Sequence, residues 1–220
     1  GPYATRKAYD LLIEAEAGFL SLTGTPEAPS KAGIAIADIA AAMYAYSGVL
    51  AALIQRGRTG EGSHVDVSML EALAEWTGHP MYYAMDEAEP PPRTAASHAY
   101  ILPYGPFEAS DGEVILLGVQ NAREWESFAR AVLERADMAE DPGLGSITER
   151  SARRETVLPE IAGILRSLTG AEMQARLERA KIGYAKLRDM ADLWDHPQLR
   201  ARGKWGETMT PMGPMPALAP

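Results

Sequence analysis

The hydrophobic pattern of the chain is densest over residues 30–55, SKAGIAIADIAAAMYAYSGVLAALIQ, where Asp38 is the one charged side chain after Lys31. A short extended run, residues 32–37, leads into Asp38. The Ala-rich residues 39–55 have a composition that favours helix. Because they are apolar on nearly every face, we expect a buried helix, with Asp38 at its natural N-cap position.

Asp38 has two interpretations at this stage. As an ordinary N-cap, its side chain accepts a hydrogen bond from a first-turn N–H group. Alternatively, a carboxylate at a helix N-terminus is stabilised in its charged form by the helix dipole. Surrounded by apolar residues, such a group could attack an activated acyl group as a nucleophile. The local pattern does not decide between the two.

The rest of the first half also shows regular spacing. Residues 9–22 predict an amphipathic helix with apolar positions at Leu11, Leu12, Ala15, Phe19 and Leu20. A Gly- and Arg-rich turn follows the Asp38 helix, and we expect three glycines there at positive φ: Gly57, Gly60 and Gly62. Residues 64–69, HVDVSM, alternate as a strand does, and residues 70–83 return to helical spacing.

The second half predicts a mixture of strands and helices. Two short strands flank a hairpin turn, Ala109-Ser110-Asp111-Gly112, with the Asp-Gly signature. An amphipathic helix then begins at Asn121, which we expect to be its cap. Further elements are two helices, a strand, a short helix and an extended tail, at residues 151–168, 171–180, 182–189, 190–203 and 204–220. The fold class is therefore α/β.

The boundary between two domains falls in an acidic, proline-rich stretch, residues 87–96, which reads as a linker. On this division a larger domain ends at residue 86. A smaller α+β domain spans residues 97–203, and we expect the tail from residue 204 to return to the large domain. The chain begins Gly1-Pro2-Tyr3 without an initiator methionine, so we expect it to be a fragment of something longer.

Composition narrows the function classes. A net charge of −9 without a Lys/Arg-rich face argues against nucleic-acid binding. The absence of cysteine removes disulfides and thiolate chemistry, and four scattered histidines lack metal-ligand spacing, so no metal is expected. We see no signal peptide, and we expect no membrane span because Lys31 and Asp38 interrupt the apolar stretch. A cytoplasmic protein is the expectation.

Several motifs together resemble the class III CoA-transferases, the family of formyl-CoA transferase and α-methylacyl-CoA racemase. In the first half they are GPYATRKAYDLLIEAEAGFLSLTG, AGIAIADIAAAMYAYSGVLAAL and RTGEGSHVDVSMLEAL. In the second half they are SHAYILPYGPFEASDGEVILLGV and DLWDHPQLRARG. The resemblance covers almost the whole chain in one order. It leaves out the family's N-terminal portion, which carries the first half of a Rossmann-like domain and most CoA contacts.

The resemblance implies a fold and a mechanism. The chain would supply part of a Rossmann-like large domain and a smaller α+β domain of an interlocked homodimer. Asp38 stands where the family has its nucleophile, which forms a mixed anhydride and then an aspartyl-CoA thioester. Coenzyme A and acyl-CoA would be substrates, with no permanently bound cofactor. Such chemistry needs oxyanion stabilisation, usually by backbone N–H groups, and the exclusion of water.

Two other functions remain open on the same resemblance. An acyl-CoA racemase or epimerase uses the equivalent aspartate with a histidine, in a His-Asp dipeptide, for α-proton exchange. This chain has Tyr9-Asp10 at that position, and the ordinary pKa of a tyrosine, about 10, is too high for an easy base at neutral pH. The difference favours the transferase. The second alternative is a catalytically silent CoA-binding or scaffold protein.

The remaining site candidates follow from the resemblance as well. Tyr9 and Asp10 would line the pantetheine or acyl pocket, or serve only in packing. His98, Tyr104 and Gly105 fall where the second domain reaches toward the acyl group. The segment ASHAYILPYGPF resembles the sequences of the subgroup that acts on C4–C5 dicarboxylic acids, such as mesaconate, citramalate or itaconate. A second carboxylate on the acceptor would need a cation, for which Arg93 is a candidate.

Arginines and polar residues elsewhere offered weaker candidates. Arg56 and Arg58 could form a phosphate-binding turn or be solvated. His64 reads as structural. Three residues at the start of one predicted helix could receive a carboxylate or serve as caps: Gln120, Asn121 and Arg123.

Overall fold

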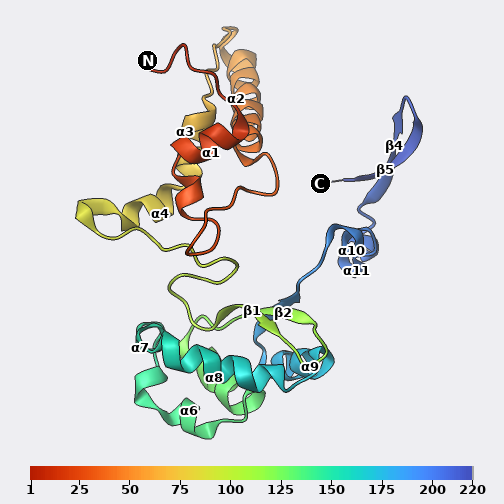
Figure 1. The fold of residues 1–220 in the computed structure, drawn as a ribbon. Coiled ribbons are helices and arrows are strands. Elements are labelled where there is room, and N and C mark those ends of the chain that lie inside the picture. The colour runs from red at the N-terminus through yellow and green to blue at the C-terminus, as the bar shows by residue number, and fades with distance from the viewer. Residues whose placement is uncertain (220) are drawn as a thin grey trace. The chain divides into compact units, whose positions relative to one another are not determined.

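The computed structural model describes residues 1–219, apart from the side chain of Glu87, as a mixture of helices and strands (Figure 1). The chain divides into two compact units, residues 1–100 and the remainder from residue 101. We describe each unit by itself. The division falls a few residues after the predicted linker, and the roles expected for the two domains stay predictions.

The first unit consists of helices joined by irregular segments. They are α1 (Asp10–Glu16), η1 (Phe19–Ser21), α2 (Ile36–Thr59), α3 (Met69–Trp76), α4 (Gly78–Tyr83) and η2 (Met85–Glu87). Helices α1 and α3 both lie against α2 and against each other. In the described part of this unit the chain forms one isolated β-bridge and no named strand. The described part of this unit is therefore helical, and its assignment to a Rossmann-like domain stays a prediction.

Helix α1 confirms the predicted position but not the predicted face. The apolar side chains of Leu11 and Leu12 are 45% and 49% exposed, whereas Glu14 is fully buried. The amphipathic interpretation was therefore wrong about which face is buried. The predicted helix also breaks at Gly18, whose φ of 75° lies in the left-handed region.

Helix α2 begins at Ile36, before Asp38, and its N-cap is Ala35. Asp38 is exposed and is the third residue of the first helical turn, so the N-cap prediction was wrong. The buried residues of α2 are Ala37 and Ala40. The prediction of a buried helix is therefore wrong for the single chain, in which large apolar side chains of α2 are exposed: Ile39, Met43, Tyr44, Tyr46, Val49, Leu50, Leu53 and Ile54.

The length of α2 bears on the expected absence of a membrane span. Lys31 lies before the helix, and α2 is long and apolar enough, by length and composition, to cross a membrane. Core helices of soluble proteins have the same properties. The absence of a membrane partner stays a prediction.

The segments after α2 differ from two predictions. Gly60 is the C-cap of α2 with a φ of 77°, as expected, but Gly57 and Gly62 do not have positive φ. Residues 64–68 form no strand in the described structure, because no neighbouring segment pairs with their backbone. Ser68 instead caps α3, its Oγ accepting a hydrogen bond from Glu71 N at 3.3 Å. The predicted helix over residues 70–83 is confirmed as α3 and α4, which meet at Thr77.

The second unit contains a three-stranded antiparallel sheet in the order β1-β2-β3. Its strands are β1 (Tyr104–Glu108), β2 (Val114–Gly118) and β3 (Gly183–Lys186). The predicted hairpin is confirmed, with Glu108 opposite Val114 and Gly112 at a φ of 82° in the turn. The strand predicted over residues 182–189 is confirmed as β3.

Helices connect β2 to β3. They are α5 (Ala122–Ser127), the π-helical η3 (Phe128–Val132), α6 (Ala136–Glu140), η4 (Pro142–Leu144), α7 (Ile147–Ala152), α8 (Arg154–Arg166) and α9 (Gly170–Ala180). Two of these helices begin with side-chain caps, of which Asn121 was predicted. Asn121 Oδ1 accepts a hydrogen bond from Glu124 N, and Thr169 forms a capping box with Glu172.

The hydrophobic core of the described structure lies in the second unit. It includes Leu102, Ile115, Leu117, Trp125, Phe128, Val132, Ile161, Leu165, Met173 and Leu177. Arg150 is fully buried among these residues, where its guanidinium donates to the carbonyl oxygens of Leu102 and Leu144, both at 2.8 Å. It also lies 4.9 Å from the centre of the Trp125 ring.

The C-terminal elements are α10 (Met190–Trp194), α11 (Pro197–Ala201), β4 (Trp205–Thr210) and β5 (Gly213–Leu218). The tail that was expected to be extended forms a hairpin, in which Thr210 lies opposite Gly213. The ring of Trp205 stacks on Trp194 of α10 at 4.8 Å.

Candidate active site

Asp38 presents its side chain at the first turn of α2. Among the described residues its carboxylate has no hydrogen-bond or ion-pair partner. The helix N-terminus beneath it is capped by Asp10, whose Oδ1 accepts hydrogen bonds from Ala37 N at 2.8 Å and Asp38 N at 3.4 Å. Asp10 therefore supplies the cap that the sequence analysis assigned to Asp38, and the Asp38 carboxylate is left available for chemistry.

This cap has a consequence for oxyanion stabilisation. The N–H groups of Ala37 and Asp38 are bound to Asp10, while those of Ile36 and Ile39 donate to Ile34 O and Ala35 O. The first-turn donors of α2 are thus already engaged. A developing oxyanion at Asp38 needs donors from elsewhere.

Tyr9 and Asp10 were expected to line the acyl pocket. Tyr9 is the N-cap residue of α1, and its carbonyl accepts hydrogen bonds from Leu12 N and Ile13 N. Its side chain is 65% exposed. The structure thus brings Asp10 to the backbone of Asp38 and leaves the Tyr9 ring accessible.

Glu14 is a site residue that sequence reasoning missed. It lies one turn after Asp10 on α1 and is fully buried. Its Oε2 accepts a hydrogen bond from Ala32 N at 3.1 Å, in the segment that leads to α2. The available signal was its i, i+4 relation to Asp10, which places both carboxylates on one face of the helix.

A hollow of about 780 Å³ lies between the N-terminal segment, α1 and the beginning of α3. Its lining includes Arg6 and Lys7. The Arg6 guanidinium lies 3.8 Å from the centre of the Tyr3 ring and pairs with Glu16 at 3.6 Å. Glu16 also lines the hollow, which therefore carries two cations against one carboxylate. The sequence analysis did not single out either cation.

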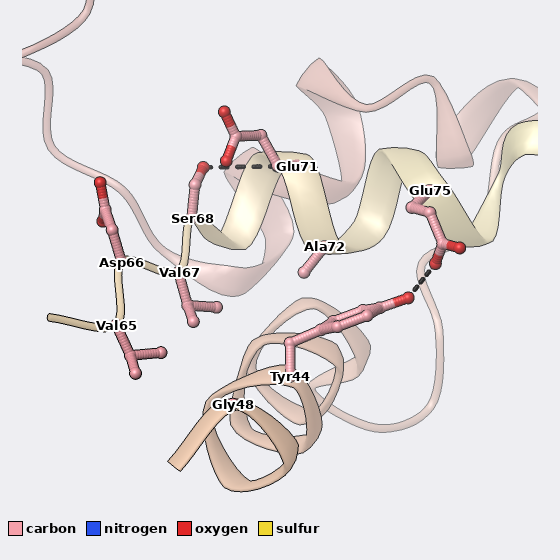
Figure 2. A pocket seen from close by; sticks show the side chains of 9 residues that line it. All are labelled: Tyr44, Gly48, Val65, Asp66, Val67, Ser68, Glu71, Ala72 and Glu75. Carbon is pink, nitrogen blue, oxygen red and sulfur yellow. Dashed lines mark hydrogen bonds between the residues drawn. The ribbon is translucent and has the colours of Figure 1, made fainter. Parts of the chain in front are cut away.

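A second pocket, of about 340 Å³, lies between α2, residues 65–68 and α3 (Figure 2). Its lining includes three carboxylates, those of Asp66, Glu71 and Glu75. Figure 2 shows Tyr44 of α2 directed at Glu75, to which its hydroxyl donates a hydrogen bond. The acidic lining makes this pocket unsuited to a polyanion such as a nucleotide phosphate.

Arg93 binds backbone rather than a carboxylate. Its Nε donates to Thr25 O at 2.9 Å and its Nη2 to Pro26 O at 3.0 Å. The pKa of Glu27 in the same loop is lowered, chiefly by the Thr25 hydroxyl and also by the charge of Arg93. Arg93 therefore fastens residues 25–27, and its expected role toward a second carboxylate stays a prediction.

His98 lies in an aromatic pocket of about 260 Å³ that also includes His79, Tyr83 and Tyr100. The His98 Nδ1 accepts a hydrogen bond from Tyr100 N at 3.1 Å. Tyr83 stacks on Tyr100 and meets the edge of His79, each at 5.1 Å between ring centres. The hydrogen bond from Tyr100 N fixes the orientation of the His98 imidazole.

Tyr104 and Gly105 belong to β1 of the second unit. The Tyr104 ring covers Gly118 of β2, where an added Cβ would lie 3.1 Å from the ring. Tyr104 is half-exposed and Gly105 is buried. Their expected contact with substrate stays a prediction.

The weaker candidates have local explanations. Arg56 and Arg58 are exposed in the last turn of α2, where cations are stabilised by the helix dipole. His64 is exposed in an irregular segment rather than in a strand. Asn121 and Gln120 take part in capping α5, since Gln120 N donates to Glu124.

The chain thus combines a helical unit, which has an accessible aspartate in the first turn of its longest helix, with an α+β unit that follows it in sequence. A model of CoA-transferase family III matches residues 1–220, and the chain belongs to that family.

Named relatives and solved structures agree with this assignment. The succinyl-CoA:mesaconate CoA-transferase of Haloarcula hispanica is 32% identical over 197 residues, covering 89% of this chain and 48% of the relative. The enzyme of the same name from Haloarcula marismortui is 32% identical over 206 residues, covering 93% and 50%. The crystal structure of a CAIB/BAIF family protein from Brucella suis matches all of this chain and 57% of its own, with a TM-score of 0.80 and 28% identity.

The coverage is unequal on the two sides. The chain spans about half the length of the curated relatives it matches. Membership of the family and the α/β fold therefore hold for this chain, while the activity of the whole protein is a matter for proposal.

Proposed function

We propose that the protein is a CoA-transferase that moves CoA from an acyl-CoA donor to a small carboxylic acid, with Asp38 as nucleophile. The observation that carries the proposal is the accessible Asp38 carboxylate, left without a partner in the described residues because Asp10 caps α2 in its place. Family membership and the names of the relatives support the reaction class. A catalytically silent homologue would have no need of that arrangement.

The reaction proceeds by exchange of activated acyl groups. A carboxylate oxygen of Asp38 attacks the thioester carbonyl and the C–S bond breaks. CoA departs as the thiolate, and a mixed anhydride between Asp38 and the donor acid remains. The thiolate then attacks the Asp38 carbonyl, which releases the donor acid and forms an aspartyl-CoA thioester. The acceptor carboxylate displaces CoA from this thioester, forming a second anhydride, and the thiolate takes the acceptor acyl group and frees Asp38.

This chain's own residues define several parts of that scheme. Asp10 fixes the turn that carries Asp38 and occupies the adjacent N–H donors, so the oxyanion donors come from another segment. The basic hollow with Arg6 and Lys7 suits the phosphates of CoA better than the acidic pocket between α2 and α3. No permanently bound cofactor is required, since CoA enters and leaves as part of the substrates.

The acceptor we favour is a small dicarboxylic acid, with a succinyl-CoA-type donor. The relatives named succinyl-CoA:mesaconate CoA-transferase support this substrate class. We also propose that the protein works as a homodimer in the cytoplasm. The exposed apolar side chains of α2 support burial against a further surface.

The racemase alternative differs in one testable residue. Proton exchange at the α-carbon needs a second base beside Asp38, and the position that would supply it holds Tyr9, with its side chain exposed to solvent. Incubation of an acyl-CoA in deuterium oxide separates the two reactions. A transferase leaves the α-carbon unlabelled, while a racemase incorporates deuterium.

The test is intact-protein mass spectrometry after incubation with succinyl-CoA, followed by hydroxylamine trapping and peptide mapping. We expect a hydroxamate on the peptide that carries Asp38, lost in Asp38→Asn. Asp66→Asn is the matched control, because Asp66 is also an exposed carboxylate of the first unit. Absence of any adduct on a sample that binds CoA would contradict the covalent mechanism.

A further inference from the structure

The approach to α2 is an irregular segment, residues 31–35, that ends one residue before the helix. In the described structure it pairs with no strand, and helix α2 holds only its last residue, since Ala35 O accepts from Ile39 N. Glu14 of α1 anchors it, because Glu14 Oε2 accepts the hydrogen bond of Ala32 N at 3.1 Å. The segment's conformation therefore depends on a side chain that lies 18 residues earlier.

The Glu14 side chain is unusual for a surface helix. It is fully buried, and its Oε1 has no hydrogen-bond partner among the described residues. Burying a carboxylate without a cation is unfavourable, and a buried oxygen without a donor adds to that cost. On stability grounds alone an apolar residue would suit the position better.

Asp10 and Glu14 form a pair on one face of α1. Asp10 holds the N–H groups of Ala37 and Asp38, and Glu14 holds that of Ala32. Residues i and i+4 of a helix lie about one turn apart on the same side. The two carboxylates thus bind both ends of the segment that delivers Asp38.

We propose that Glu14 is a positioning residue for Asp38. It fixes the chain from Ala32 to the start of α2, so that the Asp38 carboxylate is held in one place relative to α1. Because Glu14 is buried, it acts through the backbone and not on substrate. The consequence for catalysis depends on the proposed function, whereas the structural consequence does not.

The structural consequence is measured by hydrogen–deuterium exchange of the backbone amides. Glu14→Ala removes the acceptor for Ala32 N, and we expect exchange in peptides covering residues 31–38 to rise by about tenfold. Glu14→Gln retains an acceptor oxygen and should leave exchange near that of the wild type. Glu16→Ala, which removes an exposed carboxylate of the same helix, is the matched control for exchange alone, because it also removes the ion-pair partner of Arg6.

The kinetic consequence separates positioning from general stability. Misplacement of a reacting group lowers the chemical rate more than binding. We expect Glu14→Ala to lower kcat about tenfold or more with KM for acyl-CoA changed less than about twofold. Glu14→Gln should recover kcat to within about threefold of the wild type.

Several results would overturn the proposal. Unchanged exchange at residues 31–38 in Glu14→Ala would do so, as would an equal rise throughout residues 101–180. A Glu14→Gln variant as impaired as Glu14→Ala would also do so. If Glu14→Ala does not fold, Glu14→Gln is compared with the wild type, and raised exchange at residues 31–38 together with a lowered kcat in Glu14→Gln would overturn the proposal. If the wild-type protein shows no acyl transfer, the proposed function fails, and the exchange experiment alone decides the role of Glu14.

Discussion

The two units of the chain bury their hydrophobic residues very differently. In residues 1–100, the buried hydrophobic side chains of the described structure are Ala37, Ala40, Ala72 and Leu73. The second unit encloses a continuous core of large side chains from its sheet and helices. The longest helix of the first unit, α2, is nonetheless rich in apolar residues, and most of its large apolar side chains are exposed.

The difference teaches that local pattern and burial are separate properties. Apolar positions predict helices in both units, and these helices form, for example α2 in the first unit and α8 in the second. Whether a helix is buried depends on the segments that pack against it. In the second unit the sheet and the other helices of the same unit cover the apolar side chains. The first unit leaves α2 with α1 and α3 against part of its surface.

The largest effect that would test this contrast comes from truncating one apolar side chain in each unit. Phe128→Ala removes a side chain with no exposed surface, and we expect a loss of about 3–5 kcal/mol in the free energy of unfolding of the second unit. Leu53→Ala removes a side chain that is 45% exposed in the single chain. We therefore expect a loss below about 1 kcal/mol for the monomer, and a larger loss where a second copy covers α2, as the proposed homodimer requires. Urea denaturation followed by fluorescence and circular dichroism measures both.

A result that breaks the contrast would be as informative as one that confirms it. If Leu53→Ala costs as much as Phe128→Ala, α2 is covered in solution. Repeating the Leu53→Ala measurement over a range of protein concentrations shows whether a second copy covers it, because association makes stability depend on concentration.

Arg150 provides the next effect in size, from a polar group inside the second unit's core. Arg150→Met keeps most of the side-chain volume but leaves the carbonyl oxygens of Leu102 and Leu144 without their donor. We expect a loss of about 3 kcal/mol in the free energy of unfolding. Arg150→Lys should lose somewhat less than Arg150→Met, since its ammonium group can still donate a hydrogen bond. It should remain less stable than the wild type, because an ammonium group cannot reproduce the guanidinium geometry. Calorimetry of the two variants checks the order, and equal stability of Arg150→Met and wild type would contradict it.

Sequence reasoning succeeded where structure is determined by neighbours along the chain. The Asp-Gly turn predicted the β1–β2 hairpin, and Asn121 predicted the beginning of α5. Each of these signals acts over four residues or fewer. They could therefore be read without knowing the fold.

It failed where the determining contact is distant. The local pattern predicts Asp38 at the N-cap position, but the side chain that caps α2 is Asp10, 28 residues earlier. Glu14 is fully buried although it is charged, and its distant partner, Ala32 N, could not be recognised from the local pattern. Residues 64–69 have the alternation of a strand, but a strand also needs a partner, and none pairs with it in the described structure. The identity of Asp38 as a candidate nucleophile came from family resemblance rather than from its local pattern.

Two glycines allow a matched comparison of the units at a smaller scale. Gly112 in the β1–β2 turn and Gly60 at the end of α2 have φ values of 82° and 77°, and neither has an atom within 4 Å of an added Cβ. Substitution by alanine therefore introduces the same backbone strain at both, about 1–2 kcal/mol. Gly112→Ala should lose that amount from the unfolding of the second unit. Gly60→Ala should only fray the end of α2, which circular dichroism detects as a slight loss of helix. An equally cooperative loss at Gly60 would show that α2 unfolds together with a larger structure.

The smallest effect concerns the surface of the second unit and its dependence on pH. Arg135 donates two hydrogen bonds to Asp137, at 2.8 and 2.6 Å, and this pairing lowers the pKa of Asp137 to about 2. Because the pKa is lower in the folded state than its ordinary value of 3.8, the pair stabilises the fold above about pH 4. That contribution is lost as the pH falls toward 2. Asp137→Asn should therefore be slightly less stable than wild type at pH 7, and the difference should disappear near pH 2. The group is exposed, so high salt should also reduce the difference. If Asp137→Asn is still less stable than the wild type at pH 2, the substitution acts through packing rather than charge. The ion pairs on the surface of this unit would then contribute less to its stability than the core does.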